Sequence, residues 1–351
     1  MTLKDIVWNL TPPIVVKLWH KIRGDINEQN VTTKKTDKEL IFEYINEVNR
    51  RKYLSFMDID TLSKPFTQQR DYDDLAQQSI CFGSTEPVLY GAYHVLNKYI
   101  GCYSGIVSGD FKLQHGFMFD ERLPISVYNG FSKYICWGNS EKDYIQRNLN
   151  LPVYTIGSPF FYVDSLLSEA QLSEEKRRLG RNLLVFPCHS LLVDSVSYSE
   201  ADFIDFIKEE GKKFDSVRIC LYWADIIKGT TKIYEEQGFE CVCAGHISDL
   251  NFLSRQKSII ETCDCVLSNE IGSYVGYALS LGKPFLLYDQ NLTCTESDTG
   301  KSHTMRVKYN KLFSENYDYN ITDEQIDFVN YYWGLTDKRS PEELYRILYE
   351  L

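Results

Sequence analysis

Short apolar runs alternate with longer amphipathic stretches along the second half of the chain. A run of a few apolar residues predicts a strand that is buried on both faces, and the stretches between the runs have the spacing of helices. The predicted strands are 183–186, 217–222, 239–243, 265–267 and 285–288, and the predicted helices are 200–212, 226–237, 250–262 and one after residue 272. Because strands that alternate with helices form βαβ units, this half predicts a parallel sheet.

The first half alternates in the same way, although less regularly. Its predicted helices are 37–50, 88–99 and 140–148, and its predicted strands are 79–82, 134–137 and 153–156. Near the end of the chain, Ser340 and Pro341 are residue types preferred at a helix cap and in the first helical turn. They predict a helix in the tail.

These elements predict an α/β fold with two Rossmann-like parallel-sheet domains that face a central cleft. A length of 351 residues suits two domains of ordinary size. We expect the first domain over residues 1–165, a charged linker over 166–181, and the second domain over 182–325. A helical tail over 326–351 is expected to pack back on the first domain.

Composition narrows the class of protein. The chain has 43% hydrophobic and 25% charged residues, as globular proteins do, and its net charge of −11 argues against nucleic-acid binding. Cys241 with Cys243, and Cys263 with Cys265, lie in strand-like runs and not in C-x-x-C motifs. We therefore predict buried thiols and no metal site. The lack of a secretory signal predicts a cytoplasmic protein.

Residues 1–23 form a basic amphipathic segment. Four basic residues stand against the single acidic residue Asp5, and Trp8 and Trp19 lie among the apolar positions. The segment is too short and too charged to span a bilayer. It predicts either a peripheral contact with the inner face of the cytoplasmic membrane or a terminal helix packed on the protein's own core.

Small polar residues fill the turn between the strand at 265–267 and the helix that follows it. They are Ser268, Asn269, Glu270, Gly272 and Ser273. The free backbone amides and the positive end of the helix dipole at such a turn suit an anion, most often a nucleotide phosphate.

Three further loops are expected at the same edge of the sheet, because ligands of parallel sheets bind at the carboxyl ends of the strands. They are 187–190, 223–225 and 244–249. His189 and Ser190 follow the strand at 183–186, and His246 lies in the loop 244–249. His189 and Ser190 have side chains that donate hydrogen bonds to phosphate. His246 has the alternative interpretation of a surface loop residue.

The order of these motifs resembles the nucleotide-binding half of GT-B glycosyltransferases. It is most similar to bacterial enzymes that build capsules and the O-antigen of lipopolysaccharide. The matching segments are Ser268-Asn269, Gly272-Ser273, Tyr277-Ala-Leu-Ser-Leu-Gly-Lys-Pro284, Gln114-His-Gly116, Ile156-Gly-Ser-Pro-Phe160 and Phe186-Pro-Cys-His-Ser190. The resemblance covers most of residues 80–310.

The resemblance implies a metal-independent transferase that moves a sugar from a nucleotide-activated donor, with no further cofactor. The acceptor it implies is a growing, lipid-linked surface polysaccharide. His115 is the expected base for the acceptor hydroxyl, because a histidine titrates near neutrality and teichoic acid glycerophosphotransferases are similar in placing a His-Gly there. Asp110 and Asp120 are candidates for the base in place of His115, or for residues that orient it. The non-catalytic interpretation of His115 is that its side chain hydrogen-bonds to backbone groups of its own loop.

On the donor side, the resemblance gives each candidate a role. The donor phosphate is expected to be held by four side chains, His189, Ser190, Ser268 and Ser273, and by the backbone amides at Asn269 and Gly272. Glu270 accepts a ribose hydroxyl or caps the helix, and the loop with His246 lies where relatives contact the base. Pairs of His and Ser on one phosphate are similar to bacterial sialic acid and Kdo transferases, which favours a CMP-linked acidic sugar. The proline that usually follows the phosphate-binding histidine is absent after His189.

Three other functions fit the same two-domain plan. A CDP-polyol phosphotransferase and a sugar-nucleotide epimerase are the enzymatic alternatives. A non-catalytic subunit that binds a sugar nucleotide or a glycan is the alternative from another class.

Overall fold

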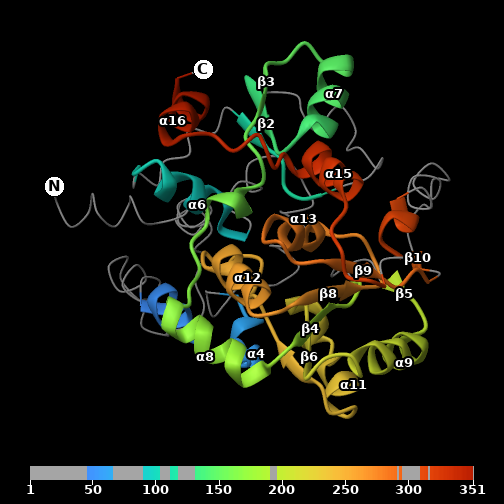
Figure 1. Cartoon of the computed structure of the whole chain (residues 1–351). Coiled ribbons are helices and arrows are strands. Elements are labelled where there is room, and N and C mark those ends of the chain that lie inside the picture. Colours follow the sequence, from blue (N-terminus) through green and yellow to red (C-terminus); the bar gives the residue numbers. More distant parts are fainter. Residues whose placement is uncertain are drawn as a thin grey trace, which may run out of the picture.

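The structure is a computed structural model, and it describes residues 46–65, 90–102, 111–117, 131–189, 196–290, 292–294, 309–314 and 317–350. Within these residues the strands form two parallel sheets, with the three-stranded sheet above the five-stranded sheet in Figure 1, and one short antiparallel pair. The predicted α/β class with two parallel sheets is therefore confirmed.

The larger sheet has the strand order of a doubly wound nucleotide-binding fold. Its order is β7-β6-β4-β8-β9, and every neighbouring pair is parallel. Numbered from β4, this order is 3-2-1-4-5, so the chain changes direction across the sheet between β4 and β8. A crevice opens outside the strand ends at such a switch point, and ligands of this fold bind there. The strands are β4 (Asn182–Phe186), β6 (Ser216–Cys220), β7 (Glu240–Val242), β8 (Cys265–Ser268) and β9 (Phe285–Leu287).

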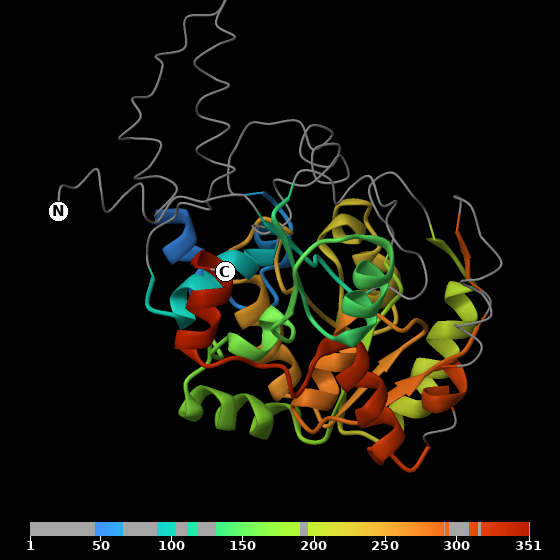
Figure 2. The same ribbon diagram turned by 90° about the horizontal axis from the view of Figure 1, so that it is seen from above.

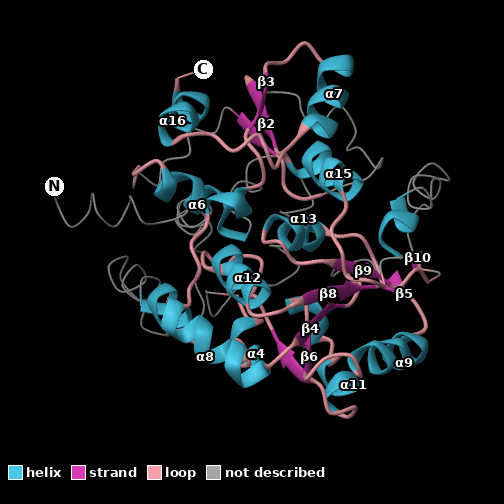
Figure 3. Ribbon diagram, in the orientation of Figure 1, coloured by secondary structure: helices cyan, strands magenta, loops and turns pink. Residues whose placement is uncertain are grey.

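Both faces of this sheet are buried, as the continuous apolar runs predict. Leu183 and Val185 pack in one apolar cluster with Phe203 of α9, and Leu184 and Phe186 pack in another cluster with α12 and α13. Figure 3 shows α9 and α11 on one side of the sheet and α12 and α13 on the other. The helices are α9 (Glu200–Gly211), α10 (Trp223–Ile227), α11 (Thr231–Glu235), α12 (Phe252–Glu261) and α13 (Ser273–Ser280).

One predicted helix of this half is wrong. The stretch 226–237 is divided between α10 and α11, because Gly229 adopts a left-handed φ of 86° between them. A glycine takes this conformation with little cost, so the helix ends there.

The smaller sheet has the order β1-β2-β3 and lies beside α6, α7 and a 3-10 turn, η3. The predicted strand at 79–82 lies outside the described residues, and the predicted helix at 37–50 is described as helix from residue 46. Helix α6 begins later than predicted because Tyr90 and Gly91 both have positive φ, 57° and 70°. The elements are α6 (Ala92–Tyr99), β1 (Phe111–Leu113), β2 (Lys133–Cys136), α7 (Asn139–Asn148), β3 (Val153–Thr155) and η3 (Pro159–Tyr162).

The remaining elements connect and cover the sheets. The charged connection forms α8, which Ser168 and Gln171 open with a capping box. The predicted tail helix is confirmed as α16, which Ser340 caps with Pro341 in its first turn. The predicted domain boundaries stay a prediction. These elements are α4 (Ile59–Leu62), α8 (Glu169–Leu179), β5 (Val196–Ser197), β10 (Thr293–Cys294), α15 (Asp323–Trp333) and α16 (Pro341–Tyr349).

The tail helices lie against the first half of the chain, and Figure 2 shows α16 beside α6. The Nζ atom of Lys133 in β2 donates to the carbonyl of Ile347 at 2.7 Å. The hydroxyl groups of Tyr93 in α6 and Tyr349 in α16 are 2.9 Å apart. These bonds close the smaller sheet with residues from the far end of the sequence.

Trp333, at the end of α15, joins the two sheets. Its fully buried ring packs on α13 so closely that a Cβ atom on Gly276 would lie 2.4 Å from it. The indole Nε1 donates to the carbonyl of Ser273 at 3.1 Å, and the Trp333 carbonyl accepts from the amide of Ser158 at 2.9 Å. The ring of Phe117, just beyond β1, stacks on the indole with a centroid distance of 4.2 Å. One side chain thus contacts loops of the smaller sheet and the first turn of α13.

The cysteines of both C-x-C pairs are buried, as predicted. Burial raises the pKa of Cys241, Cys243 and Cys263 to about 12, which keeps these thiols protonated at neutral pH. Among the residues that the structure describes, no cluster of His, Cys, Asp and Glu has the arrangement of a metal site. Residues 1–23 lie outside the description. None of the described helices combines the length and apolar character needed to cross a bilayer.

Replacing Trp333 with alanine is expected to lower the free energy of unfolding by about 3–5 kcal/mol, because a buried aromatic ring leaves a cavity and lost contacts. Urea denaturation followed by circular dichroism measures this. The matched control is Tyr331→Ala in the same helix, where the side chain is 38% exposed and the expected loss is about 1 kcal/mol or less. Equal losses in the two variants would contradict the joining role of Trp333.

Candidate functional site

The candidate site lies at the switch point between β4 and β8. His189 follows β4 and Asn269 follows β8, and these strands are neighbours in the sheet. The two loops are bonded directly, because the amide of Cys188 donates to Oδ1 of Asn269 at 2.7 Å. The Cys188 thiol lies 2.8 Å from a carboxylate oxygen of Glu270 and donates to it. The residues predicted from the two motifs thus come together at one edge of the larger sheet.

Two buried polar nitrogens, one in the turn from β8 to α13 and one in the loop after β4, have no hydrogen-bond partner in the part of the chain that the structure describes. Asn269 is 2% exposed, and its Nδ2 has no partner among the described residues. The same holds for the buried Nδ1 of His189, in a ring that is itself half-buried. Gly272 supplies no capping side chain to α13. A buried donor without a partner costs about 1–3 kcal/mol, and it often marks a ligand site.

Other residues of the turn hold it in shape. Ser268 is fully buried, and its hydroxyl lies 2.7 Å from the hydroxyl of Tyr274 and accepts from the amide of Glu270 at 3.0 Å. Its hydroxyl therefore faces the turn itself, so we assign it to positioning and not to contact with a phosphate. Ser273 is half-buried at the first position of α13. Burial raises the pKa of Tyr274 well above its usual range.

The loop that carries His115 is fixed against α13. The side chain of Gln114 bridges it, since Nε2 donates to the carbonyl of Gly116 at 3.0 Å and Oε1 accepts from the amide of Trp137 at 2.7 Å. The amide of Phe117 donates to Oγ of Ser273 at 3.2 Å. His115 is exposed between these anchors. A solvent-accessible imidazole therefore lies on a loop that touches the phosphate-type turn of the other sheet.

A row of rings connects the two sides of the site. The rings of His115 and Tyr90 are stacked with centroids 5.3 Å apart, and those of His189 and Tyr222 are stacked at 4.2 Å. The hydroxyl groups of Tyr90 and Tyr222 lie 3.2 Å apart and complete the row. Burial raises the pKa of Tyr222 to about 12 and that of Tyr90 well above its usual range. Both phenols are therefore protonated at neutral pH, and one donates to the other.

The loop after β7 is held by buried charges. Arg255 is fully buried and donates to the carbonyl of Ala244 at 2.6 Å and to the carboxylate of Asp249, which is also fully buried, at 3.0 Å. The amide of Tyr90 reaches this loop from the first half and donates to the carbonyl of Ile247 at 2.6 Å. The loop therefore has one conformation set by both halves of the chain.

His246 lies within that loop and is only 2% exposed, so its interpretation as a surface residue is wrong. Its Nδ1 accepts from the amide of Ser248 at 3.1 Å, and its ring packs on Trp223 at a centroid distance of 4.2 Å. Burial, with the nearby charge of Arg51, lowers the pKa of His246 to about 3. The side chain is neutral at physiological pH, so it offers no positive charge to a phosphate.

Three predicted site residues, Asp110, Asp120 and Ser190, lie outside the described residues. The sequence reasoning missed Tyr90 and Tyr222. Tyr222 sits two residues beyond β6, at the same strand edge as the other candidates, and this position was the available signal. Tyr90 carries no local signal, because its role depends on a contact between distant parts of the chain.

No protein-family model matches the chain, and no curated protein matches it. Several solved structures, among them those of the following three proteins, are similar at low identity. The wall teichoic acid polymerase TagF has 13% identity over 68% of each chain, with a TM-score of 0.34. MnaA from S. aureus in complex with UDP has 9% identity over 85% of this chain and 87% of that one, with a TM-score of 0.38. Sucrose-phosphate synthase from Thermosynechococcus elongatus has 10% identity over 64% and 60%, with a TM-score of 0.32. At these values the similarities carry no argument about function, which rests on the geometry of the site.

The buried neutral His246 makes stability depend on pH. In the unfolded chain a histidine takes up its proton near pH 6.5, whereas in the folded protein His246 does so only near pH 3. The unfolded state therefore binds more protons in this window, and the folded state loses stability as the pH falls through it. Relative to His246→Asn, whose Oδ1 keeps the acceptor, the wild type should lose up to about 1.4 kcal/mol per pH unit. Urea melts of both proteins from pH 7 to pH 4 measure the difference, and parallel curves would contradict it.

Proposed function

We propose that this protein is a GT-B-type glycosyltransferase that moves a sugar from a nucleotide-activated donor to a growing, lipid-linked surface polysaccharide. The observation that supports it best lies at the switch point of the larger sheet, where the buried Nδ2 of Asn269 and Nδ1 of His189 have no hydrogen-bond partner among the described residues. An anion at this point would satisfy both donors. The loop of the smaller sheet that carries His115 faces the same turn.

The donor phosphate is proposed to bind at the first turn of α13. Nδ2 of Asn269, Nδ1 of His189 and the hydroxyl of Ser273 donate to its oxygens, together with the free amides of the helix terminus. Negative charge grows on this phosphate as the sugar leaves. Donors that are already in place stabilise that charge without reorganisation, which lowers the barrier.

The acceptor hydroxyl is proposed to approach His115 from solvent. The neutral imidazole takes the proton of the hydroxyl as the new glycosidic bond forms. Tyr90 supports the ring from behind, and Gln114 fixes the loop, so the base has a defined position. Since a Cβ atom on Gly116 would lie 3.9 Å from Oγ of Ser273, base and leaving group lie on adjoining loops. We propose Asp110 and Asp120 as alternatives for the base, or as residues that orient His115.

We propose a CMP-linked acidic sugar as the donor. The donors of the turn are an amide, a hydroxyl and an imidazole, and such neutral groups suit a phosphodiester with a single negative charge. Glu270 is proposed to accept a ribose hydroxyl, and the loop with His246 to pack against the base. Transfer is proposed to need no metal ion, and residues 1–23 to bring the enzyme to the membrane surface that carries its acceptor.

Nucleotide binding is expected to depend on Asn269. Calorimetric titration with CMP, CDP, UDP and GDP should give one preferred nucleotide, and we expect CMP. In Asn269→Asp the shape is kept, but an acceptor with negative charge replaces the donor, so the dissociation constant should rise at least about tenfold. The control is the same change at the exposed Asn148, which should leave the constant unchanged. Binding that is equal in all three proteins would contradict the site.

Transfer is expected to depend on His115. His115→Ala should lower the rate of sugar transfer by about 10²–10⁴, the usual contribution of a general base, while nucleotide affinity stays within about twofold. The control is His94→Ala, an exposed histidine of α6. A transfer rate that is unchanged in His115→Ala would remove its role as base. Nucleotide binding without turnover of any sugar or polyol donor in the wild type would favour a binding subunit over an enzyme.

A further inference from the structure

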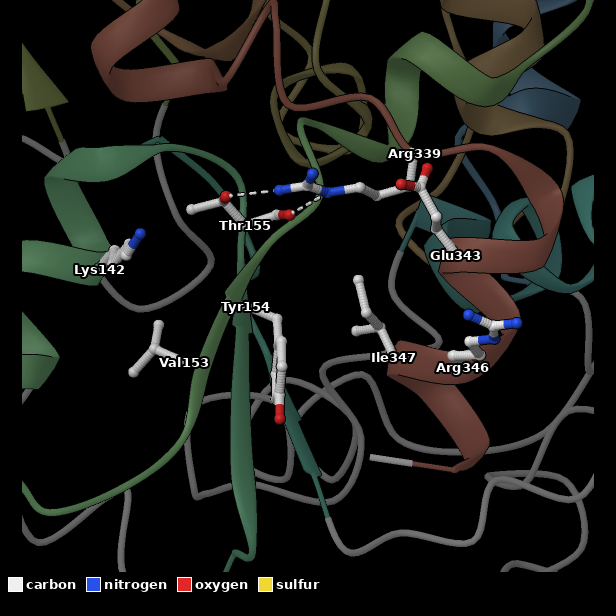
Figure 4. Close-up of a pocket in the computed structure, with 8 residues that line it drawn as sticks. All are labelled: Lys142, Val153, Tyr154, Thr155, Arg339, Glu343, Arg346 and Ile347. Carbon is white, nitrogen blue, oxygen red and sulfur yellow. Dashed lines mark hydrogen bonds between the residues drawn. The ribbon is translucent and has the colours of Figure 1, made fainter.

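A cavity opens along the edge of β3 that pairs with no described strand, in the smaller sheet, and none of its lining residues belongs to the site described above. Its volume is about 410 Å³, within the range of small-molecule sites. Figure 4 shows its walls, which come from β3, from α7 and from α16 with the segment before it. The walls that matter for recognition are Lys142, Val153, Tyr154, Arg339, Arg346 and Ile347.

One part of the cavity is apolar. Tyr154 and Ile347 lie on opposite sides of the opening, and Val153 lies next to Tyr154 along the strand. The ring of Tyr154 is half-buried and has a face toward the cavity. Such a surface matches the C–H face of a ligand that carries polar groups at its rim.

The strand edge supplies hydrogen-bonding groups. The amide of Ile156 donates to the carbonyl of Cys136, and the amide of Tyr134 donates to the carbonyl of Pro152, both at 2.9 Å. Because the pairing of parallel strands alternates, the backbone groups of Val153 between them turn away from β2 and toward the cavity. An N–H and a C=O in this position suit the hydroxyl groups of a ligand.

Three cations, Lys142, Arg339 and Arg346, and one carboxylate, Glu343, line the cavity. The Glu343 carboxylate accepts from the amide and the hydroxyl of Ser340 at 2.9 Å, and Arg339 lies 3.5 Å from the carboxylate of Asp337.

The ammonium group of Lys142 is half-buried and makes no hydrogen bond or ion pair with any residue that the structure describes. Arg339 is held in place, since its Nε donates to the carbonyl of Thr155 at 2.8 Å and its Nη2 to Oγ1 of the same residue at 3.1 Å. Arg346 adds a third, exposed cation that Glu342 partly neutralises at 2.7 Å. A ligand with one acid group would pair with Lys142, the cation that lacks a partner in this part of the chain.

We infer that this cavity is a second carbohydrate site, which binds a sugar unit with one acid group, either a carboxylate or a phosphate. The acid group binds Lys142, the ring of the sugar packs between Tyr154 and Ile347, and its hydroxyl groups bond to the edge of β3. The carboxyl end of β3 lies at the same sheet edge as that of β1, about 10 Å away across two strand spacings. If the chain is the proposed transferase, the site holds an acidic unit of the growing polymer. That role rests on the proposed function, whereas the binding itself does not.

Titration of the full-length protein tests the site with four probes: glucuronic acid, glucose 6-phosphate, glucose and inorganic phosphate. Saturation-transfer NMR reports the weak binding expected for single sugars. One or both acidic sugars should bind at least about tenfold more tightly than glucose and than inorganic phosphate, and which one binds identifies the acid group. Phosphate binding as tight as that of glucose 6-phosphate would show an anion site without sugar recognition and would overturn the inference.

Variants locate the binding. In Lys142→Met, which keeps the aliphatic stem, the affinity for the acidic sugar should fall at least about tenfold, and in Arg346→Gln by a smaller factor. The matched controls are Lys232→Met on α11 and Arg177→Gln on α8. Arg177 is an exposed arginine that pairs with a glutamate one helical turn before it, as Arg346 pairs with Glu342. Melting temperatures confirm that each variant is folded. Affinity that is unchanged in Lys142→Met would overturn the inference.

The two sites are distinguished in the same samples. Asn269→Asp should weaken nucleotide binding and leave the acidic sugar bound, and Lys142→Met should do the reverse. If no nucleotide binds but the acidic sugar does, the proposed function fails and the second site stands. If nucleotide binds and no acidic sugar does, the second site fails alone.

Discussion

A single buried indole sets the relation between the two sheets, and the candidate site depends on that relation. Trp333 contacts α13 through Gly276 and the carbonyl of Ser273, and it contacts the loop after β1 through Phe117. The turn that would bind a phosphate and the loop that carries His115 therefore share one packing partner. Because interiors are close-packed, a shift of this ring moves both loops together. The distance between the loop that carries His115 and the first turn of α13 is thus fixed by the core and not by the loops themselves.

Some polar groups around the candidate site have hydrogen-bond partners, and others have none among the described residues. The loop after β7 is held by the Arg255–Asp249 pair, and the hydroxyl of Ser268 bonds within its own turn. Asn269 and His189, by contrast, keep donors that no described residue uses. Tyr90 adds a positive φ, which costs about 1–3 kcal/mol in a residue other than glycine. Rigid surroundings and a few unsatisfied groups at one crevice are what a preorganised site requires.

Much of the fold follows from the period of apolar residues, whereas the site follows only in part. The strands of the larger sheet and the turn after β8 could be predicted, because buried parallel strands have continuous apolar runs and small polar residues mark their ends. The single helix over 226–237 was wrong because the left-handed Gly229 breaks it. The stack of Tyr90 on His115 could not be predicted, since it depends on a tertiary contact. The cavity at β3 could not be predicted from the sequence either, because residues of α16, nearly two hundred positions after β3, form one of its walls.

The closure of the smaller sheet by the tail has a consequence for synthesis on the ribosome. The bond from Lys133 to Ile347 spans 214 residues of sequence, and that between Tyr93 and Tyr349 spans 256. Contacts of such separation form late, because long loops must close first. The larger sheet draws its strands from a continuous stretch of chain and is able to fold as soon as that stretch emerges. The first half, although it is made first, stays incomplete until the tail arrives, so we expect the strands of the larger sheet to pair before the smaller sheet is closed.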